Sequence, residues 1–490
     1  MRRVPSAEAA AGNSSPAALE DPASDTDAGG LHEQILPWWG MYATSVASEA
    51  PSAGLALSIA GVALSAGNGS WLTYVIITVG ILGVGCCVSW MARRFTTSGG
   101  LYSMSAAVGG SAGGYLQGLP QLLSLAIALP ALVFGSGIYL EAFLMKAGLP
   151  GGKALYLVCY LAVLAIALVF ALRDVRVSSR ILLLLECGSV TLIVALLIIS
   201  VARHHGGLVD HAQLGLHGVT VHGMFLSVAF ATYVMAGFEN SATLGREARN
   251  PNRDIPRAVT GTILIVGVLY IAASYVEVLA LPGGKLAASA APLNDIASLA
   301  GVGWFSWIVD LCVSVSFLSC VLAVTNTGAR VLYTLGRDRV LPKAFSRVTA
   351  RHGEPWFAVL LLTAGTLAAV LIFGLLPTAP LNAYAYMGTL SGYFFIAVYL
   401  MVIAMTLLRA FRIRALSGFL VAAGMVGAAT LILAMYFSFV PLPQGAYGTV
   451  FWIFAALVGA GLAVAGVGGA LRPQWWRNIA AQGGSGGNEQ

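Results

Sequence analysis

Charged residues are scarce in this chain of 490 residues. Asp, Glu, Lys and Arg together make up 9% of it, whereas a soluble domain carries roughly 25%. Because 58% of the residues are hydrophobic, the chain has too few charges to cover a surface that faces water. This composition excludes an ordinary soluble enzyme, a disordered protein and a nucleic-acid-binding protein, despite the net charge of +6.

Cysteine motifs and an apolar leader are also missing. The six cysteines all lie inside apolar runs, with spacings that match neither a zinc site nor a redox motif. The N-terminal residues lack the apolar core of a cleavable signal peptide. We therefore expect no resident metal or cofactor, and a disordered cytoplasmic tail at the start of the chain.

Long apolar runs, in contrast, fill most of the remaining sequence. About twelve stretches have the roughly 20 residues that a helix needs to cross about 30 Å of hydrocarbon. We number these spans 1 to 12: 36–66, 71–92, 113–143, 154–172, 181–201, 221–244, 258–281, 304–335, 355–375, 381–408, 418–440 and 447–471. The sequence therefore predicts an all-α membrane protein with about 12 transmembrane helices.

The distribution of basic residues supports this threading. If the N-terminus is cytoplasmic, only four of the 26 Lys and Arg residues fall in outside connections, namely Lys146, Lys153, Arg203 and Lys285. Basic residues favour the cytoplasmic side of a membrane, so we predict a multi-pass protein of the plasma membrane with both termini cytoplasmic. The positive charge then faces anionic lipid headgroups and requires no nucleic acid.

Five of the seven histidines lie in one predicted outside connection: His204, His205, His211, His217 and His222. Imidazole binds zinc, copper and nickel, and its charge changes near neutral pH. Metal binding and sensing of external acidity are therefore alternatives. Because the spacings fit no strong ligand pattern, we expect solvated residues of a flexible loop.

Six ionisable side chains within the spans need an explanation, because a charge deep in the membrane costs about 3 kcal/mol or more. Glu141 and Glu277 lie near predicted outer ends of spans, where we expect water to reach them. Asp310 lies in the outer third of span 8, and we expect a vestibule to wet it. Glu49, Glu186 and Glu239 remain as candidates for a functional role.

Two of these carboxylates stand beside sequences that interrupt a helix. Span 1 contains Ser48-Glu49-Ala50-Pro51-Ser52, and span 6 contains Ala236-Gly237-Phe238-Glu239. Proline and small residues open a helical backbone. An open backbone at membrane depth survives only where it is buried in protein or lines a cavity. The alternative is a pair of simple kinks in packed helices, but two breaks with carboxylates favour a polar cavity between them.

The positions of the two breaks predict an inverted repeat. Spans 1 and 6 begin two sets of five spans, and an odd number makes the sets enter the membrane from opposite sides. Opened carbonyls receive an ammonium group, and exposed N–H groups receive a carboxylate.

The expected organisation is a tail (1–34), a first repeat (35–203), a histidine-rich loop (204–220), an inverted second repeat (221–410), two additional helices (411–472) and a flexible cytoplasmic tail (473–490).

Three stretches carry a more specific pattern. They are ARRFTTSGGLY at 92–102, GFE at 237–239 continuing through LGREARNPNRDIPRA at 244–258, and ARVLYTLGRD at 329–338 followed by Leu341-Pro342. Together with the span count, they resemble the amino acid–polyamine–organocation family of secondary transporters over roughly residues 35–470. The resemblance implies a fold of two inverted five-helix repeats (LeuT-like) with substrate bound midway, at broken helices 1 and 6.

The resemblance also implies roles for individual residues. Ala236, Gly237 and Phe238 match the opened part of span 6 that meets the substrate's ammonium group, and Tyr233 matches an aromatic position that covers the substrate in some relatives. Glu239 matches the family's acidic residue after the break.

Span 1 departs from the family pattern. The family has a Gly-Ser-Gly-like run where this chain has Ser48, Glu49, Ala50, Pro51 and Ser52. We still expect these five residues to bind substrate, with Glu49 as the group that could select a cation.

Coupling to protons is predicted from the intramembrane carboxylates Glu239, Glu49 and Glu186. A structural carboxylate bonded to backbone amides is the alternative for Glu239, and solvation at a helix end beside Arg180 is the alternative for Glu186. Sodium coupling would instead use hydroxyl groups, for which Ser319, Thr325 and Thr327 are available. We expect Tyr384, Tyr386 and Tyr393 in span 10 to be packing residues more than gates.

These observations predict a secondary active transporter of an amino acid or a related amine, with no enzymatic activity. An exchanger or a non-transporting substrate sensor on the same fold is the alternative. The sensor is disfavoured because the predicted tails are short and of low complexity. A channel would lack alternating gates, and no nucleophile–base pair converges within the spans to support an enzyme.

Overall fold

The computed structural model describes residues 38–95, 100–172, 179–204, 207–244, 248–282, 284–337, 341–348 and 355–471. Every long element in these ranges is a helix. The predicted N-terminal tail lies outside the described residues, and so does the C-terminal one.

Eleven helices in the described part of the chain are long and apolar enough to cross a membrane. One of them, Pro51–Ala92, combines the second half of predicted span 1 with the whole of span 2. The eleven helices thus account for the twelve predicted crossings. The prediction of an all-helical, multi-pass membrane protein is confirmed.

The helix bounds follow the predicted spans closely. Span 1 is divided into α1 (Trp38–Glu49), α2 (Pro51–Ala53), the π-helix η1 (Gly54–Ser58) and α3 (Ile59–Ala66). Span 6 is divided into α9 (Val221–Val234) and the 3₁₀ helix η3 (Phe238–Leu244). The other spans are α4 (Ser70–Ala92), α5 (Gly100–Lys146), α6 (Lys153–Leu172), α7 (Ser179–Ala202), α10 (Pro251–Ala280), α13 (Ser306–Arg337), α14 (Trp356–Leu375), α15 (Pro380–Arg412), α16 (Gly418–Phe439) and α17 (Gly445–Leu471).

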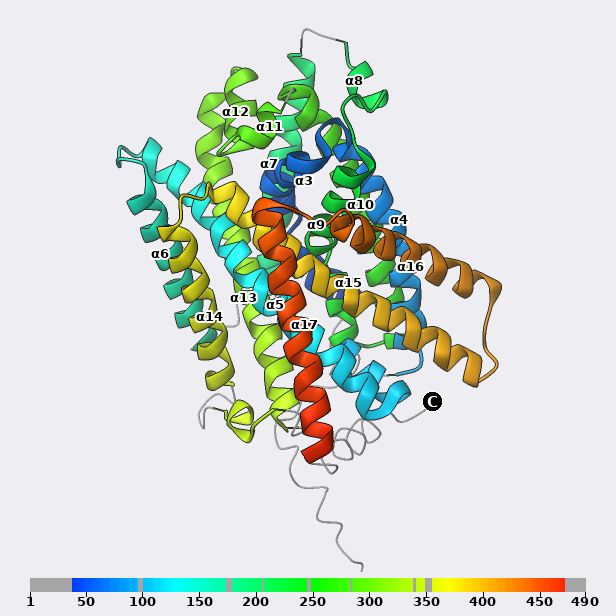
Figure 1. The fold of residues 1–490 in the computed structure, drawn as a ribbon. Helices are drawn as coiled ribbons and strands as arrows, with labels where there is room; N and C mark the ends of the chain where they lie inside the picture. The colour runs from blue at the N-terminus through cyan, green and yellow to red at the C-terminus, as the bar shows by residue number, and fades with distance from the viewer. Residues whose placement is uncertain are drawn as a thin grey trace, which may run out of the picture. The chain divides into compact units, whose positions relative to one another are not determined.

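Short helices lie in the connections. They are η2 (Gly67–Gly69), α8 (His211–Leu214), α11 (Lys285–Ala288), α12 (Pro292–Leu299), η4 (Gly303–Phe305) and η5 (Lys343–Ser346). Figure 1 shows α8, α11 and α12 together at the top of the bundle, which we call the α12 end.

The beginning of α5 is the largest difference from the predicted bounds. This helix starts at Gly100 instead of near residue 113, and Gly110 interrupts it with φ 60° and ψ −146°. The segment 100–112 is rich in Gly, Ser and Ala, so it has no long apolar run that would mark it as part of a membrane helix.

The long helix α5 forms the centre of the packing, between α13 and α15. On the other side of the bundle α10 and α16 both pack against α4 (Figure 1). Small residues let helices approach closely in a membrane. Gly392 of α15 is an example, because a Cβ there would lie 2.1 Å from the Ala229 carbonyl oxygen of α9.

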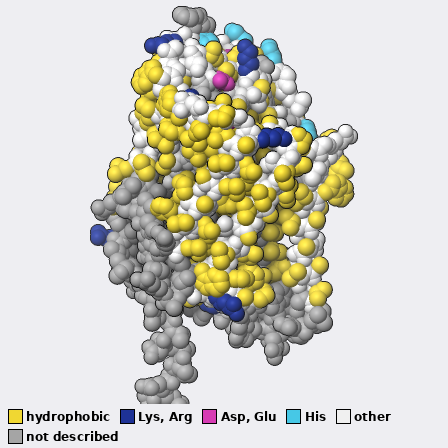
Figure 2. Space-filling view, turned by 90° about the vertical axis from the view of Figure 1, so that its left-hand side faces the viewer, with side chains coloured by type: hydrophobic (Ala, Val, Ile, Leu, Met, Phe, Trp, Pro, Cys, Tyr) yellow, Lys and Arg dark blue, Asp and Glu magenta, His cyan; other side chains and the backbone are white. Residues whose placement is uncertain are grey.

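The surface of the described residues is that of a protein surrounded by lipid. Figure 2 shows a broad band of hydrophobic side chains, with Lys and Arg mainly toward the two ends of the bundle. Large apolar side chains such as Phe419, Trp452 and Leu462 are exposed on α16 and α17. A soluble monomer rarely exposes so continuous an apolar surface, so the band marks the part that faces hydrocarbon.

The prediction that water reaches Glu141, Glu277 and Asp310 is wrong. Glu277 and Asp310 are 0% exposed, and Glu141 is also buried. For Glu277 and Asp310 the reason is α12, which packs across α7, α10 and α13 with Leu293 and Ile296 fully buried. Glu141 instead accepts a hydrogen bond from the Gly152 amide at 3.4 Å, just before α6. Both carboxylate oxygens of Glu277 lack a hydrogen-bond partner among the described residues.

The described part of the histidine-rich connection is also more ordered than a flexible loop. Asp210 caps α8 by accepting hydrogen bonds from the Ala212 and Gln213 amides, at 2.9 and 3.4 Å. Gln213 is buried and donates to the Tyr275 carbonyl of α10 at 3.1 Å. Slight burial raises the pKa of Asp210, but the hydrogen bonds from Gln213 and Ala212 outweigh it and hold the pKa below its ordinary value. Among the described residues, no group of three or more His, Cys, Asp or Glu side chains is arranged to hold a metal ion.

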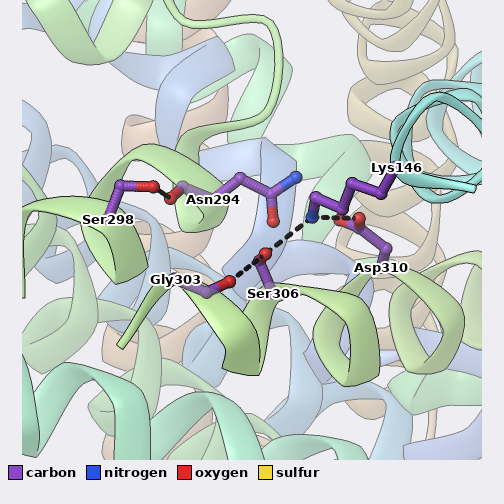
Figure 3. A network of polar contacts seen from close by, with 6 residues as sticks. All are labelled: Lys146, Asn294, Ser298, Gly303, Ser306 and Asp310. Carbon is purple, nitrogen blue, oxygen red and sulfur yellow. Dashed lines mark hydrogen bonds and ion pairs between the residues drawn. The ribbon is translucent and has the colours of Figure 1, made fainter. Parts of the chain in front are cut away.

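The buried carboxylate of Asp310 is paired with a cation. Its Oδ2 lies 2.5 Å from Lys146 Nζ, and the same ammonium group donates to Ser306 Oγ at 2.7 Å. Figure 3 shows the ammonium group between these two acceptors, with the Asn294 side chain of α12 pointing toward it. The pair thus joins the ends of α5 and α13 beneath α12.

We predict that Asp310→Ala lowers the stability of the protein by roughly 3 kcal/mol, because it leaves the Lys146 ammonium without its partner. In detergent, the midpoint of thermal unfolding followed by tryptophan fluorescence should fall by about 5 °C. The double variant Lys146→Met with Asp310→Leu removes both charges and should recover most of the loss. A double variant no more stable than Asp310→Ala would contradict a role for the ion pair.

Candidate functional site

The helix of span 1 breaks at Ala50. This residue has a left-handed backbone with φ 46° and ψ 65°, and Pro51 begins the next helical segment. Proline has no N–H to continue the ladder and disfavours the α conformation in the residue before it. The following π-helix, Gly54–Ser58, widens the backbone further.

The break in span 6 lies against the break in span 1. Between Val234 and Phe238 the chain leaves the helix, and Gly237 has φ 127°. A Cβ at Gly237 would lie 2.9 to 3.0 Å from the Ser48–Glu49 backbone. In addition, Ser45 Oγ of α1 donates to the Phe238 carbonyl at 2.9 Å. The two interrupted backbones are therefore in direct contact.

A small cavity of about 50 Å³ lies at the two breaks. It is lined by Ser48, Glu49, Ala50, Ala53, Gly54, Ser58, Leu125, Ala128, Leu132, Tyr233, Val234, Ala236, Phe317, Cys320, Val324, Tyr384 and Phe395. These residues come from both broken spans and from α5, α13 and α15.

Five of the nine residues predicted to bind substrate line this cavity: Ser48, Glu49, Ala50, Tyr233 and Ala236. The other four shape its walls from behind. Pro51 and Ser52 form the start of α2, Gly237 supports the Ser48–Glu49 backbone, and Phe238 is buried against Tyr399.

Glu49 has an unusual position for a carboxylate. It is 6% exposed, and neither carboxylate oxygen has a hydrogen-bond partner among the described residues. None of the residues that line the cavity is Lys, Arg or His. No cation among the described lining residues compensates this acid.

Unlike that of Glu49, the carboxylate of Glu239 accepts hydrogen bonds. Its Oε2 accepts the Gly237 amide at 3.0 Å, and both oxygens lie 3.2 Å from the Tyr399 hydroxyl of α15. The carboxylate thus holds the opened backbone of span 6. These are the contacts expected for the structural alternative, and a role in proton transfer stays a prediction.

Glu186 joins three helices. Its Oε1 accepts the Ser52 amide of α2 at 2.6 Å, and its Oε2 accepts the Ser316 hydroxyl of α13 at 2.7 Å. The side chain is 5% exposed, so solvation at a helix end does not describe its surroundings. It also borders a groove between α7 and α13.

The hydroxyls available for sodium coupling are engaged within their own helix. Ser319, Thr325 and Thr327 each donate to the carbonyl four residues earlier, at 2.7 to 2.9 Å. Such bonds are common for Ser and Thr in helices, and they give no support to a sodium site.

An aromatic cluster closes the cavity on the side of Ser58. The Tyr384 hydroxyl shares a hydrogen bond of 2.6 Å with Ser58 Oγ. The Tyr384 ring lies 5.6 Å from the Phe230 ring, 6.2 Å from that of Tyr233 and 6.0 Å from that of Phe317. Because Ser58 follows the break toward α3, this cluster separates the cavity from the α12 end.

Sequence reasoning missed part of this site. Tyr384 packs against three aromatic rings, as expected, but it also lines the cavity, which the sequence did not indicate. Tyr386 and Tyr393 pack against Tyr447 and Phe439, as expected. The apolar walls from α5 and α13 resemble any other helix face in the sequence, so no local signal marks them.

Comparison with known proteins identifies the class. The amino acid permease family matches residues 46–479, and the chain belongs to this family. It is therefore a multi-pass membrane transporter and not an enzyme.

Individual relatives share about a quarter of the aligned residues with this chain. The branched-chain amino acid permease of Bacillus subtilis is 24% identical over 70% of this chain and 75% of its own length. An uncharacterized transporter of Mycobacterium tuberculosis is 28% identical over 64% of this chain and 68% of its own. The vacuolar cationic amino acid transporter 4 of Arabidopsis thaliana is 23% identical over 65% of this chain and 54% of its own.

We predict that Tyr384→Phe makes the cavity easier to reach from the α12 end. Loss of one hydrogen bond weakens the closed arrangement by about 1 kcal/mol, or about fivefold in its population. Cys320 lines the cavity, so its modification by a membrane-impermeant thiol reagent, quantified by peptide mass spectrometry, should become faster.

Tyr386→Phe is the matched control, because Tyr386 packs against Tyr447 outside the cavity. Equal modification rates in the two variants would contradict the assignment of Tyr384 to the closure.

Proposed function

We propose that this chain moves an amino acid or a related amine across the plasma membrane by alternating access, driven by a proton gradient. The observation that carries the proposal is the contact between the two helix breaks beside a cavity, where Gly237 abuts the Ser48–Glu49 backbone. Paired interrupted helices are the best pointer to a transporter's substrate site.

Spans 1 and 6 form the moving part in this proposal. The Ser45–Phe238 hydrogen bond and the packing of Gly237 tie the two spans together, so displacement of one displaces the other. Opening toward the α12 end, the predicted outside, requires the Ser58–Tyr384 hydrogen bond to break. Transport then follows from exposing the same cavity to each side in turn.

Glu186 is the best placed of the three carboxylates proposed for proton coupling. It links the segment after the break in span 1 to α7 and α13. A hydrogen bond to an ionised group is about twice as strong as one between neutral groups. Protonation of Glu186 therefore weakens its hold on the Ser52 amide and releases α2 from the other helices.

Glu239 and Glu49 complete the proposed set. A proton on Glu239 would weaken its bonds to Gly237 and Tyr399, which hold the break in span 6. Glu49 lines the cavity itself, where it meets either a proton or the substrate.

The purified full-length protein in sealed vesicles tests the proposed function. We predict that labelled amino acids or the corresponding amines accumulate inside when an inward proton gradient is imposed, and that accumulation stops when an ionophore collapses it. Uptake that ignores the gradient but requires internal substrate would indicate an exchanger. Specific binding without any uptake would indicate a sensor.

Substitution of the carboxylates tests the coupling. Glu186→Gln keeps the size of the side chain but cannot change charge, so gradient-driven accumulation should fall by about tenfold or more while exchange persists within about twofold. Ser189→Ala, on the same helix beside the groove, is the matched control and should change neither assay. If Glu186→Gln or Glu239→Gln left gradient-driven uptake untouched, the proton role of that residue would be wrong.

A further inference from the structure

The substrate cavity contains one buried acid and no base among its lining residues. Glu49 is the acid, and its two oxygens have no partner in the described part of the chain. A buried charge of this kind is costly unless a partner of opposite charge compensates it. A bound cation would supply that partner.

The backbone at the breaks supplies little to an anion. In span 1, the Ala50 amide donates to the Val46 carbonyl, Pro51 has no N–H, and the Ser52 amide donates to Glu186. These residues stand where the family has its Gly-Ser-Gly-like run.

The break in span 6 is occupied in the same way. The Gly237 amide donates to Glu239 at 3.0 Å, and the Asn240 amide donates to the Gly237 carbonyl at 3.0 Å. At both breaks, then, a carboxylate of the protein already takes an N–H group that would otherwise receive a carboxylate of the substrate.

The remaining walls suit an apolar body. Leu125, Leu132 and Phe317 line the cavity, and the rings of Tyr233 and Tyr384 face it from spans 6 and 10. Aromatic rings also attract a cation that lies over their faces. A diamine would need a second free acid, but Glu239 is bonded and does not line the cavity.

The geometry points to a substrate that binds as a net cation: a primary monoamine with an apolar or aromatic body, whose ammonium group pairs with Glu49. This assignment rests on the proposed transport function and specifies its substrate. It makes the amine a better ligand than the amino acid of the same side chain, because a zwitterion brings a carboxylate while the Ala50, Ser52 and Gly237 amides at the breaks are already engaged.

Matched pairs of ligands test this inference. Phenethylamine is compared with phenylalanine, and isoamylamine with leucine, by scintillation proximity binding to the purified protein and by uptake into vesicles, with protein-free vesicles as the control for passive entry. Each amine should half-saturate the protein at a concentration about tenfold or more below that of its amino acid. Cadaverine, a diamine, should bind more weakly than isoamylamine.

Variants assign the preference to Glu49. Glu49→Gln should raise the half-saturating concentration of both amines by about tenfold or more and leave those of the amino acids within about threefold. Glu277→Gln removes an equally buried acid away from the cavity and should preserve the preference, which controls for general damage to the fold. Glu49→Asp keeps the charge and should retain part of it.

The outcomes separate this inference from the proposed function. Tighter binding of the amino acids than of their amines would overturn the inference while transport stands. An amine preference unchanged in Glu49→Gln would overturn the assignment to this residue. Failure to bind or move either member of both pairs would overturn the inference, whereas failure of every labelled amino acid and amine in the vesicle assay would contradict the proposed function.

Discussion

The structure depends on one close contact, between Gly237 in the break of span 6 and the Ser48–Glu49 backbone in the break of span 1. Only glycine combines φ 127° with so little space. The contact lets two interrupted helices lie side by side at membrane depth, where open backbone survives only when it is buried or lines a cavity. The cavity at the breaks and the proposed joint motion of the two spans both follow from it.

Buried carboxylates complete this arrangement, and each has a different surrounding. Glu239 and Glu186 accept backbone amides and so stabilise the opened segments of spans 6 and 1. Asp310 is compensated by Lys146. Glu49 alone lines the cavity, without a partner in the described residues. Two acids of the protein thus bind amides at its own broken backbones, and in our proposal the acid left in the cavity binds the substrate.

Much of the fold was predictable from the sequence, because a membrane helix must be long and apolar over its whole length. The breaks were predictable too, since Pro51 and Gly237 act on the local backbone. Burial of Asp310 and Glu277 was not, because it depends on tertiary packing, in which α12 folds back across α7, α10 and α13. The same holds for Tyr384, whose bond to Ser58 joins residues 326 positions apart. The division into two repeats and the sidedness of the bundle remain predictions.

The contact of the two helix breaks and the binding of a cation by Glu49 can be seen in a density map of the full-length protein in lipid nanodiscs, recorded by electron cryomicroscopy with and without phenethylamine. We predict that spans 1 and 6 are interrupted at Ala50 and at Met235–Gly237, with their backbones in contact. The nitrogen of the ligand should lie about 3 Å from the Glu49 carboxylate. Continuous helices through both positions, or a ligand bound away from the breaks, would contradict this prediction.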